Sequence, residues 1–250
     1  MARVGGVMEV VMKLVIAMLL LGPALAFPGE TPPAGPAPTV VTFDDDATGQ
    51  PSPSFKPVVG NWSVTDLEGA RGLMVNGSRR RRRTASDDLV EQGRTLYVER
   101  YAEFANGVTP PAYFPLAVYQ GECPSDDLAM SVSFYPKSGR IDQAAGLAWN
   151  ITASGSYLGA AASAREGNLR FFRVVRGART ILNTVPHVQT TSRTWHTLQV
   201  ALHGRSLSVS VDGQERLKRE VEAPPTGGCG LWSSGDSEVL FDDFKVGKAP

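Results

Sequence analysis

The residues of this chain that could do chemistry gather near its C-terminal end, where Asp242 and Asp243 interrupt an apolar run. We expect this run to be the second of two β-strands joined by a polar turn. In a strand with a period of two, Asp242 would lie on the apolar face between Leu240 and Phe244. A carboxylate on such a face must be hydrogen-bonded or bound to a cation. The pattern therefore predicts that Asp242 is buried or metal-bound.

A second acidic run could complete a cation site. Asp44, Asp45 and Asp46 follow a short apolar segment that we expect to be a strand. Carboxylate oxygens presented by a loop suit calcium. A solvated turn explains the run equally well, so the sequence leaves both interpretations open. We name Asp242, Asp44 and Asp45 as candidate ligands of a structural calcium ion.

Other common catalytic and metal-binding arrangements are missing from the sequence. His196 and His203 lie seven residues apart, so they would fall on opposite faces of a strand and cannot share a metal ion. No Gly-x-Ser-x-Gly nucleophile elbow and no glycine-rich phosphate loop occurs. The chain has two cysteines, Cys123 and Cys229, which could form a disulfide or remain as free buried thiols.

The N-terminal segment has the features of a secretory signal peptide. Basic residues precede the apolar run Leu14–Leu21, and Ala24-Leu25-Ala26 fits a cleavage site. We expect residues 1–26 to be removed, which predicts a secreted or periplasmic protein; an uncleaved N-terminal anchor is the alternative. No later segment is apolar enough to cross a membrane.

The rest of the chain divides into a linker and one domain. Residues 27–38 are rich in proline and alanine and are expected to be an extended linker. Residues 39–248 have the size of one large all-β domain. The full chain carries 25 basic and 25 acidic residues, so no global field favours nucleic acid or an anionic membrane.

Short alternating runs dominate the domain and predict β-structure. Four runs alternate apolar with small or polar residues: Leu128–Phe134, Asn168–Val175, Leu198–Leu202 and Leu207–Val211. Asp212-Gly213 is a strong hairpin-turn signal directly after the last run. Many short strands with frequent turns indicate a two-sheet sandwich or a barrel.

Two segments depart from the strand pattern. Residues 87–104 could form a short helix with acidic residues in its first turn, although Gly93 interrupts it. The run Arg79–Arg83 could bind a polyanion, but we favour a solvated loop because no aromatic residues are interleaved with it.

Several blocks of the chain together are similar to one family. They are Asp45–Pro51, Val59–Val64, Gly139–Trp149, Thr194–Leu198, Gly230–Ser233 and Phe241–Phe244. Together they resemble secreted bacterial proteins with a concanavalin A-like, or laminin G-like, jelly roll. The nearest named relatives are the 3-keto-disaccharide hydrolase domains.

The resemblance implies a fold more firmly than an activity. It implies an all-β, two-sheet antiparallel jelly-roll sandwich, with Asp242 at the position of an aspartate that helps to hold a structural calcium. The Glu-x-Asp-x-x-Glu motif of glucanases is absent. That absence argues against retaining glycosidase chemistry, which needs two carboxylates about 5 Å apart.

Sugar-binding sheets stack sugars on aromatic rings and hydrogen-bond their hydroxyl groups. The candidate ligand-binding residues of the right types are Trp149, Tyr157, Arg170, His196, Trp232 and Asp236. Core packing is the alternative for the aromatic residues. We expect Trp232 to lie open beside a polar turn, and Trp195 to be wedged at the edge of the sandwich.

These observations predict an exported jelly-roll domain that binds carbohydrate or a cell-surface glycan, with no partner among nucleic acids. A hydrolase or lyase acting on 3-keto-disaccharides or related glycosides is the alternative, by resemblance alone. A structural or adhesion module is a second alternative.

Overall fold

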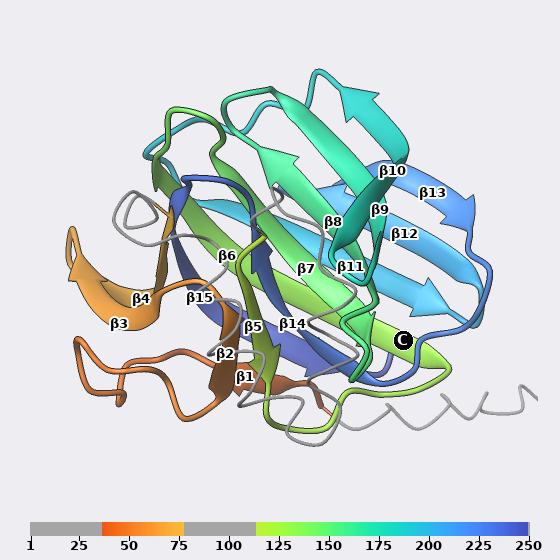
Figure 1. Ribbon diagram of the computed structural model, residues 1–250, viewed down its shortest axis with the longest axis horizontal. Coiled ribbons are helices and arrows are strands. Elements are labelled where there is room, and N and C mark those ends of the chain that lie inside the picture. The colour runs from red at the N-terminus through yellow and green to blue at the C-terminus, as the bar shows by residue number, and fades with distance from the viewer. Residues whose placement is uncertain (1–36, 78–113, 250) are drawn as a thin grey trace, which may run out of the picture. The chain divides into compact units, whose positions relative to one another are not determined.

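The computed structural model describes residues 37–77 and 114–249, and within these ranges every regular element is a β-strand (Figure 1). The predictions for the signal peptide, the Arg79–Arg83 run and a helix over 87–104 lie outside the described residues. No helix in the described ranges is long and apolar enough to cross a membrane.

One sheet has eight antiparallel strands. Its order is β13-β12-β11-β6-β15-β4-β3, and β1 pairs with β15. These strands are β1 (Thr39–Val41), β3 (Trp62–Leu67), β4 (Ala70–Asn76), β6 (Asp127–Ser138), β11 (His196–His203), β12 (Ser206–Val211), β13 (Gln214–Glu220) and β15 (Glu238–Gly247).

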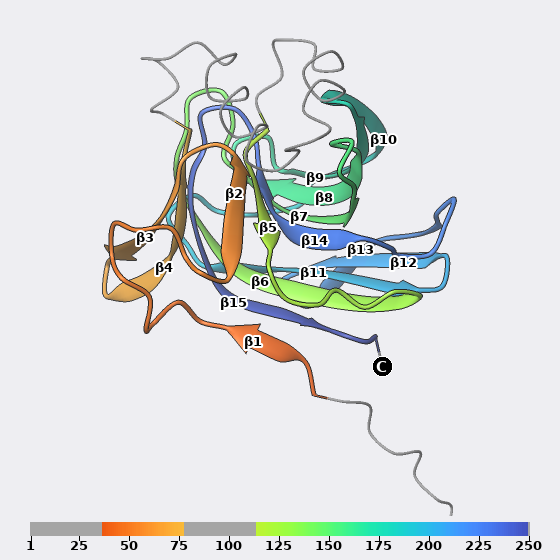
Figure 2. The same cartoon turned by 60° about the horizontal axis from the view of Figure 1, so that its bottom comes forward.

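The other sheet has seven antiparallel strands and lies over the first (Figure 2). Its order is β10-β9-β8-β7-β14-β5-β2. These strands are β2 (Phe55–Val59), β5 (Leu116–Tyr119), β7 (Ala144–Ile151), β8 (Tyr157–Ser163), β9 (Asn168–Val175), β10 (Ala178–Pro186) and β14 (Gly228–Ser233). The predicted all-β, two-sheet antiparallel sandwich is therefore confirmed.

The main core fills the space between the sheets. Leu198 and Val200 of β11 point into it, and Trp149 of β7 and Phe171 of β9 meet them from the other sheet. Burying one such aliphatic side chain contributes about 1.5–3 kcal/mol. Because the alternate residues of β11 are buried, the intervening ones must lie on the outer face of the eight-stranded sheet.

The hairpin between β12 and β13 has the predicted two-residue turn. Asp212 and Gly213 both have positive φ, at 51° and 73°, and Val211 pairs with Gln214 across them. A turn with positive φ at both central residues favours this Asp-Gly sequence. The turn brings the Asp212 carboxylate back beside the start of β11, where it accepts the Thr197 N–H at 2.8 Å.

An irregularity in β15 changes which residues share a face with Asp242. Along β6, Asp242 pairs with Ser133 and Lys245 pairs with Ser131, so two residues of β15 oppose one residue of β6. Asp243, at φ 47°, is part of this β-bulge. The extra residue shifts the alternation by one. Asp242 shares the outer face with Leu240, as expected, whereas Phe244, which was expected on the same face, points into the core.

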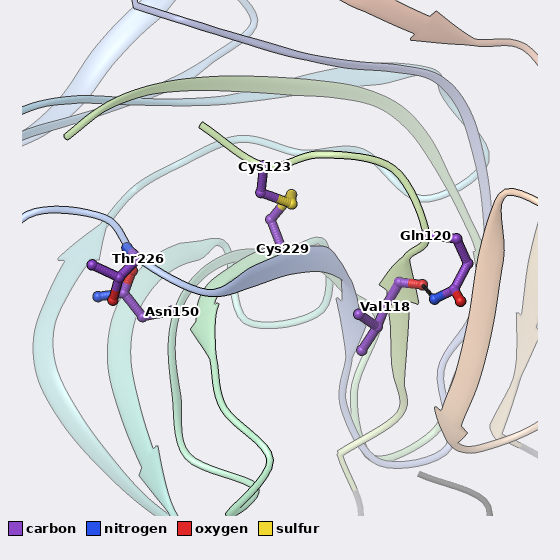
Figure 3. The surroundings of a disulfide bond; sticks show 6 residues. All are labelled: Val118, Gln120, Cys123, Asn150, Thr226 and Cys229. Atoms are coloured by element: carbon purple, nitrogen blue, oxygen red, sulfur yellow. Dashed lines mark hydrogen bonds between the residues drawn. A yellow bond between two sulfur atoms is a disulfide. The ribbon is translucent and has the colours of Figure 1, made fainter. Parts of the chain in front are cut away.

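The two cysteines form a disulfide, which settles the alternative that the sequence left open. Cys123 lies in the segment after β5, and Cys229 lies in β14 (Figure 3). The bond joins residues that are 106 positions apart. Closing so long a loop in the unfolded chain removes much of its entropy, so the bond should stabilise the fold.

Replacing both cysteines by serine should lower the free energy of unfolding by about 2–5 kcal/mol. Urea denaturation of the wild type and the double variant measures this difference. A reducing agent should lower the stability of the wild type and leave that of the double variant unchanged. Equal stability of the two proteins would show that the bond does not constrain the unfolded chain.

Candidate functional site

A polar hollow of about 350 Å³ opens on the outer face of the eight-stranded sheet. It lies where β4, β6, β11 and β15 run side by side and the β12–β13 turn folds over them (Figure 1). Its lining residues are Ala70, Ser133, Trp195, His196, Thr197, Asp212, Asp242 and Asp243. The hollow thus combines one large aromatic ring with three carboxylates and a histidine.

Trp195 is the exposed aromatic residue of this hollow. Its side chain is 39% exposed, and its ring centroid lies 5.6 Å from that of Tyr135. The expectation that Trp195 is wedged at the edge of the sandwich, as a large packed side chain, is wrong. Since His196 and Leu198 are buried along β11, the residue before His196 must take the outward direction. Strand parity alone could have found it.

His196 joins the two segments that flank Trp195. Its Nδ1 lies 2.8 Å from Asp212 Oδ2, and its Nε2 accepts the Thr191 N–H at 2.8 Å. Nε2 also lies 3.1 Å from the Thr191 carbonyl oxygen. The buried ring therefore links the Thr191 segment to the β12–β13 turn and positions this wall of the hollow.

Asp242 is a half-buried carboxyl with no positive partner near it in the described structure. Burial raises its pKa to about 6, and the negative charges of Asp243 and Asp44 act in the same direction. Its Oδ1 accepts the Asp243 N–H at 2.7 Å, which partly offsets these effects. The prediction that Asp242 is not a free surface acid is consistent with this environment.

A second, shallower hollow of about 280 Å³ continues along the same face. Ser131, Gln199 and Lys245 line it, and they stand one pleat further along the strands than Ser133, Thr197 and Asp242. Ser208 and Ser210 of β12 extend it sideways. The second hollow thus presents hydroxyl, amide and ammonium groups next to the acidic first hollow.

The aromatic residues expected to bind sugar are buried instead. Trp232 is 1% exposed, and its Nε1 donates to Tyr157 Oη at 3.1 Å. The expectation that Trp232 lies open at a rim is therefore wrong. Trp149 is fully buried and stacks on Phe171. Trp149 belongs to the main core, whereas Trp232 and Tyr157 belong to a second apolar cluster on the opposite face of the seven-stranded sheet.

Two further candidates have their charges engaged within the chain. Arg170 pairs with Glu166. The Asp236 carboxylate accepts the backbone N–H groups of Arg140, Ile141 and Asp142. Burial acts to raise the pKa of Asp236, but these three bonds outweigh it and lower the pKa below its usual value. Of the predicted ligand-binding residues, only His196 lines the hollow.

The calcium ligands predicted from sequence are not brought together as a set. In residues 37–77 and 114–249, no three His, Cys, Asp or Glu side chains are grouped so that they could hold a metal ion. Arg71 donates to Asp66 and to the backbone carbonyl of Asp44, and it interacts electrostatically with Asp45. Arg71 thus supplies positive charge beside the acidic run. Calcium at Asp242 stays a prediction.

The fold has several solved counterparts. A carbohydrate-binding module, CBM66 from Bacillus subtilis, is 12% identical with a TM-score of 0.55, covering 78% of this chain and 96% of its own. The β-glucanase of Bacillus licheniformis is 10% identical with a TM-score of 0.51, and the match covers 86% of this chain and 99% of the glucanase chain. Domain 4 of AbnA, an extracellular GH43 arabinanase from Geobacillus stearothermophilus, is 9% identical with a TM-score of 0.50. The match covers 86% of this chain and 94% of the arabinanase domain.

At these identities the similarity establishes a jelly-roll fold of the concanavalin A-like type and no activity. No protein-family model matches the sequence, and a search of curated proteins finds no match.

The two tryptophans should respond oppositely to truncation. Trp232→Ala should lower the free energy of unfolding by about 3–5 kcal/mol, because it empties a packed site. Trp195→Ala should change it by about 1 kcal/mol or less, as for an exposed side chain. Chemical denaturation of both variants measures the difference. Equal losses would contradict the burial of the two rings.

The Asp242→Asn variant distinguishes two possible roles of Asp242: a calcium ligand, or a half-buried carboxyl without a positive partner. With bound calcium, a chelator should lower the melting temperature of the wild type and not that of the variant. Without calcium, the raised pKa means that wild-type stability falls as pH rises from about 4 to about 6. The variant should then be the more stable protein at neutral pH, by about 1 kcal/mol or less after solvent screening. Melting both proteins with and without chelator decides between the two outcomes.

Proposed function

We propose that this protein binds carbohydrate through the outer face of its eight-stranded sheet, in a groove formed by the two hollows. The observation that carries the proposal is the exposed Trp195 ring at the edge of a polar hollow. An aromatic ring presents a flat apolar surface for the C–H groups of a sugar ring. Among the exposed large apolar side chains of the described residues, Trp195 is the only aromatic one.

The polar side chains of the groove suit the other parts of a sugar. Ser133 and Thr197 line the first hollow, and Ser131 and Gln199 line the second. Hydroxyl and amide groups both donate and accept, as sugar hydroxyl groups do. They stand on paired β-strands, which hold binding groups more rigidly than loops do. A linear glycan lying along the strands would meet both hollows.

The structural counterparts support the choice of ligand class. One is a carbohydrate-binding module, and the arabinanase domain was solved in complex with arabinotriose. We carry over only the ligand class, since the sequences share about a tenth of their residues. The contacts proposed here belong to this chain's own outer face.

We also infer that the protein works outside the cytosol, as a secreted or periplasmic protein. The Cys123–Cys229 bond supports this location, because disulfides persist mainly in oxidising compartments. Cell-surface glycans are accessible there, and so are free polysaccharides.

Hydrolysis is the second candidate function, and Asp242 favours it. A carboxyl with a pKa near 6 can keep its proton close to neutral pH and act as a general acid. Asp212 and Asp243 line the same hollow and would be the candidate bases. The 3-keto-disaccharides and related glycosides implied by the family resemblance are the substrates to test, with release of a reducing sugar as the readout and Asp242→Asn as the inactive control.

A glycan array, probed with and without chelator, tests the binding proposal. Trp195→Ala should weaken binding by roughly tenfold or more, the usual loss for a central tryptophan. Ile141→Ala is the matched control, since Ile141 is an exposed apolar residue that does not line the groove. Binding that survives Trp195→Ala unchanged would refute the groove as the site.

A further inference from the structure

The first hollow is an acidic part of the outer face of the eight-stranded sheet. Asp212, Asp242 and Asp243 all line it, and none of its lining residues in the described structure is Lys or Arg. Asp212 accepts the Thr197 N–H and lies beside His196 Nδ1, and Asp243 accepts the Ser133 hydroxyl at 3.4 Å, so hydrogen bonds but no lysine or arginine of the lining meet these carboxylates. A neutral glycan would leave these charges as they are.

The cations Arg71, Arg193 and Lys245 of neighbouring features do not line the hollow. Arg71 pairs with Asp66 at 2.7 Å. Arg193 acts on Tyr135, whose hydroxyl donates to Glu68. Lys245 lines the second hollow, one pleat away. The charges that act on Asp242 itself are those of Asp243 and Asp44, and both are negative.

The exposed ring of Trp195 is a second and independent feature that suits a cation. A cation over the face of a tryptophan is attracted by the ring's negative π surface, by about 0.5–1 kcal/mol at exposed sites. The buried Tyr135 ring packs against that of Trp195, with the two centroids 5.6 Å apart. Aromatic faces next to carboxylates form the environment in which proteins recognise organic ammonium groups.

We propose that the first hollow binds a sugar unit that carries a protonated amino group, with the ammonium group facing Asp242 and Asp243 and the sugar ring against Trp195. This inference rests on the proposed function and specifies its ligand. An ammonium group offers three donors, and the carboxylates of the hollow are acceptors. The second hollow, with Ser131, Gln199 and Lys245, takes the next unit of the chain through its hydroxyl groups.

Three β-1,4-linked oligosaccharides of equal length test the proposal: one of glucosamine, one of N-acetylglucosamine and one of glucose. Titration calorimetry at about pH 6 keeps the amino groups protonated. The glucosamine oligomer should bind about tenfold or more tightly than the other two, and its affinity should fall with added salt.

Charge-removing variants locate the effect. Asp242→Asn and Asp243→Asn should each reduce the preference for glucosamine about tenfold, while the affinity for neutral oligomers stays the same. Asp126→Asn is the matched control, because it removes one exposed carboxylate outside both hollows. Thermal melting of each variant confirms that it is folded.

The outcomes separate this inference from the proposed function. Equal affinity for all three oligomers, lost in Trp195→Ala, would overturn the amino-sugar inference and leave carbohydrate binding in place. A glucosamine preference that survives both aspartate changes would also overturn it, as would binding that a chelator abolishes, since the carboxylates would then hold a metal ion. No binding of any oligomer here or on the glycan array would overturn both.

Discussion

The extra residue in β15 decides how the outer face of the eight-stranded sheet is built. Before the bulge, Phe241 points into the core; after it, Phe244 and Val246 do so. Without the shift, these side chains would take opposite faces and β15 could not cover the core along its whole length. Asp242, which precedes the shift, lies on the outer face with Leu240. The bulge thus keeps the core-facing residues of β15 apolar on both sides of it, and the two aspartates at the bulge are left to line the hollow on the outer face.

The sequence predicts the sandwich because alternation is a local property. β9 has the predicted bounds, and β11 and β12 contain the alternating runs. The bulge is a different case, since it is defined by pairing with β6, a strand more than a hundred positions away. A period-two reading of β15 had no means of detecting it. Asp242 was correctly placed on one face with Leu240, but Phe244 and Val246 were wrongly placed on that face for this reason.

The two tryptophans show a second limit of reading one strand at a time. Leu231 lies in the main core, so Trp232 must point to the opposite face of β14, which suggests exposure. That face carries its own apolar cluster, in which Phe172 packs 4.6 Å from the Trp232 ring. An outward direction implies exposure only where the outer face is polar. On the eight-stranded sheet the apolar cluster of the outer face is small, with Met74, Tyr135 and Leu240 buried, and the outward-pointing Trp195 beside it stays exposed.

A half-buried carboxyl surrounded by negative charge costs stability, and folding alone gives no reason to keep it. An asparagine at position 242 could accept the Asp243 N–H equally well without that cost. Such local conflicts are expected where function sets the residue. In this chain the conflict coincides with an exposed tryptophan and a hollow on a rigid sheet. A positively charged ligand group would relieve it on binding, so part of the binding free energy would come from removing an unfavourable interaction already present in the free protein.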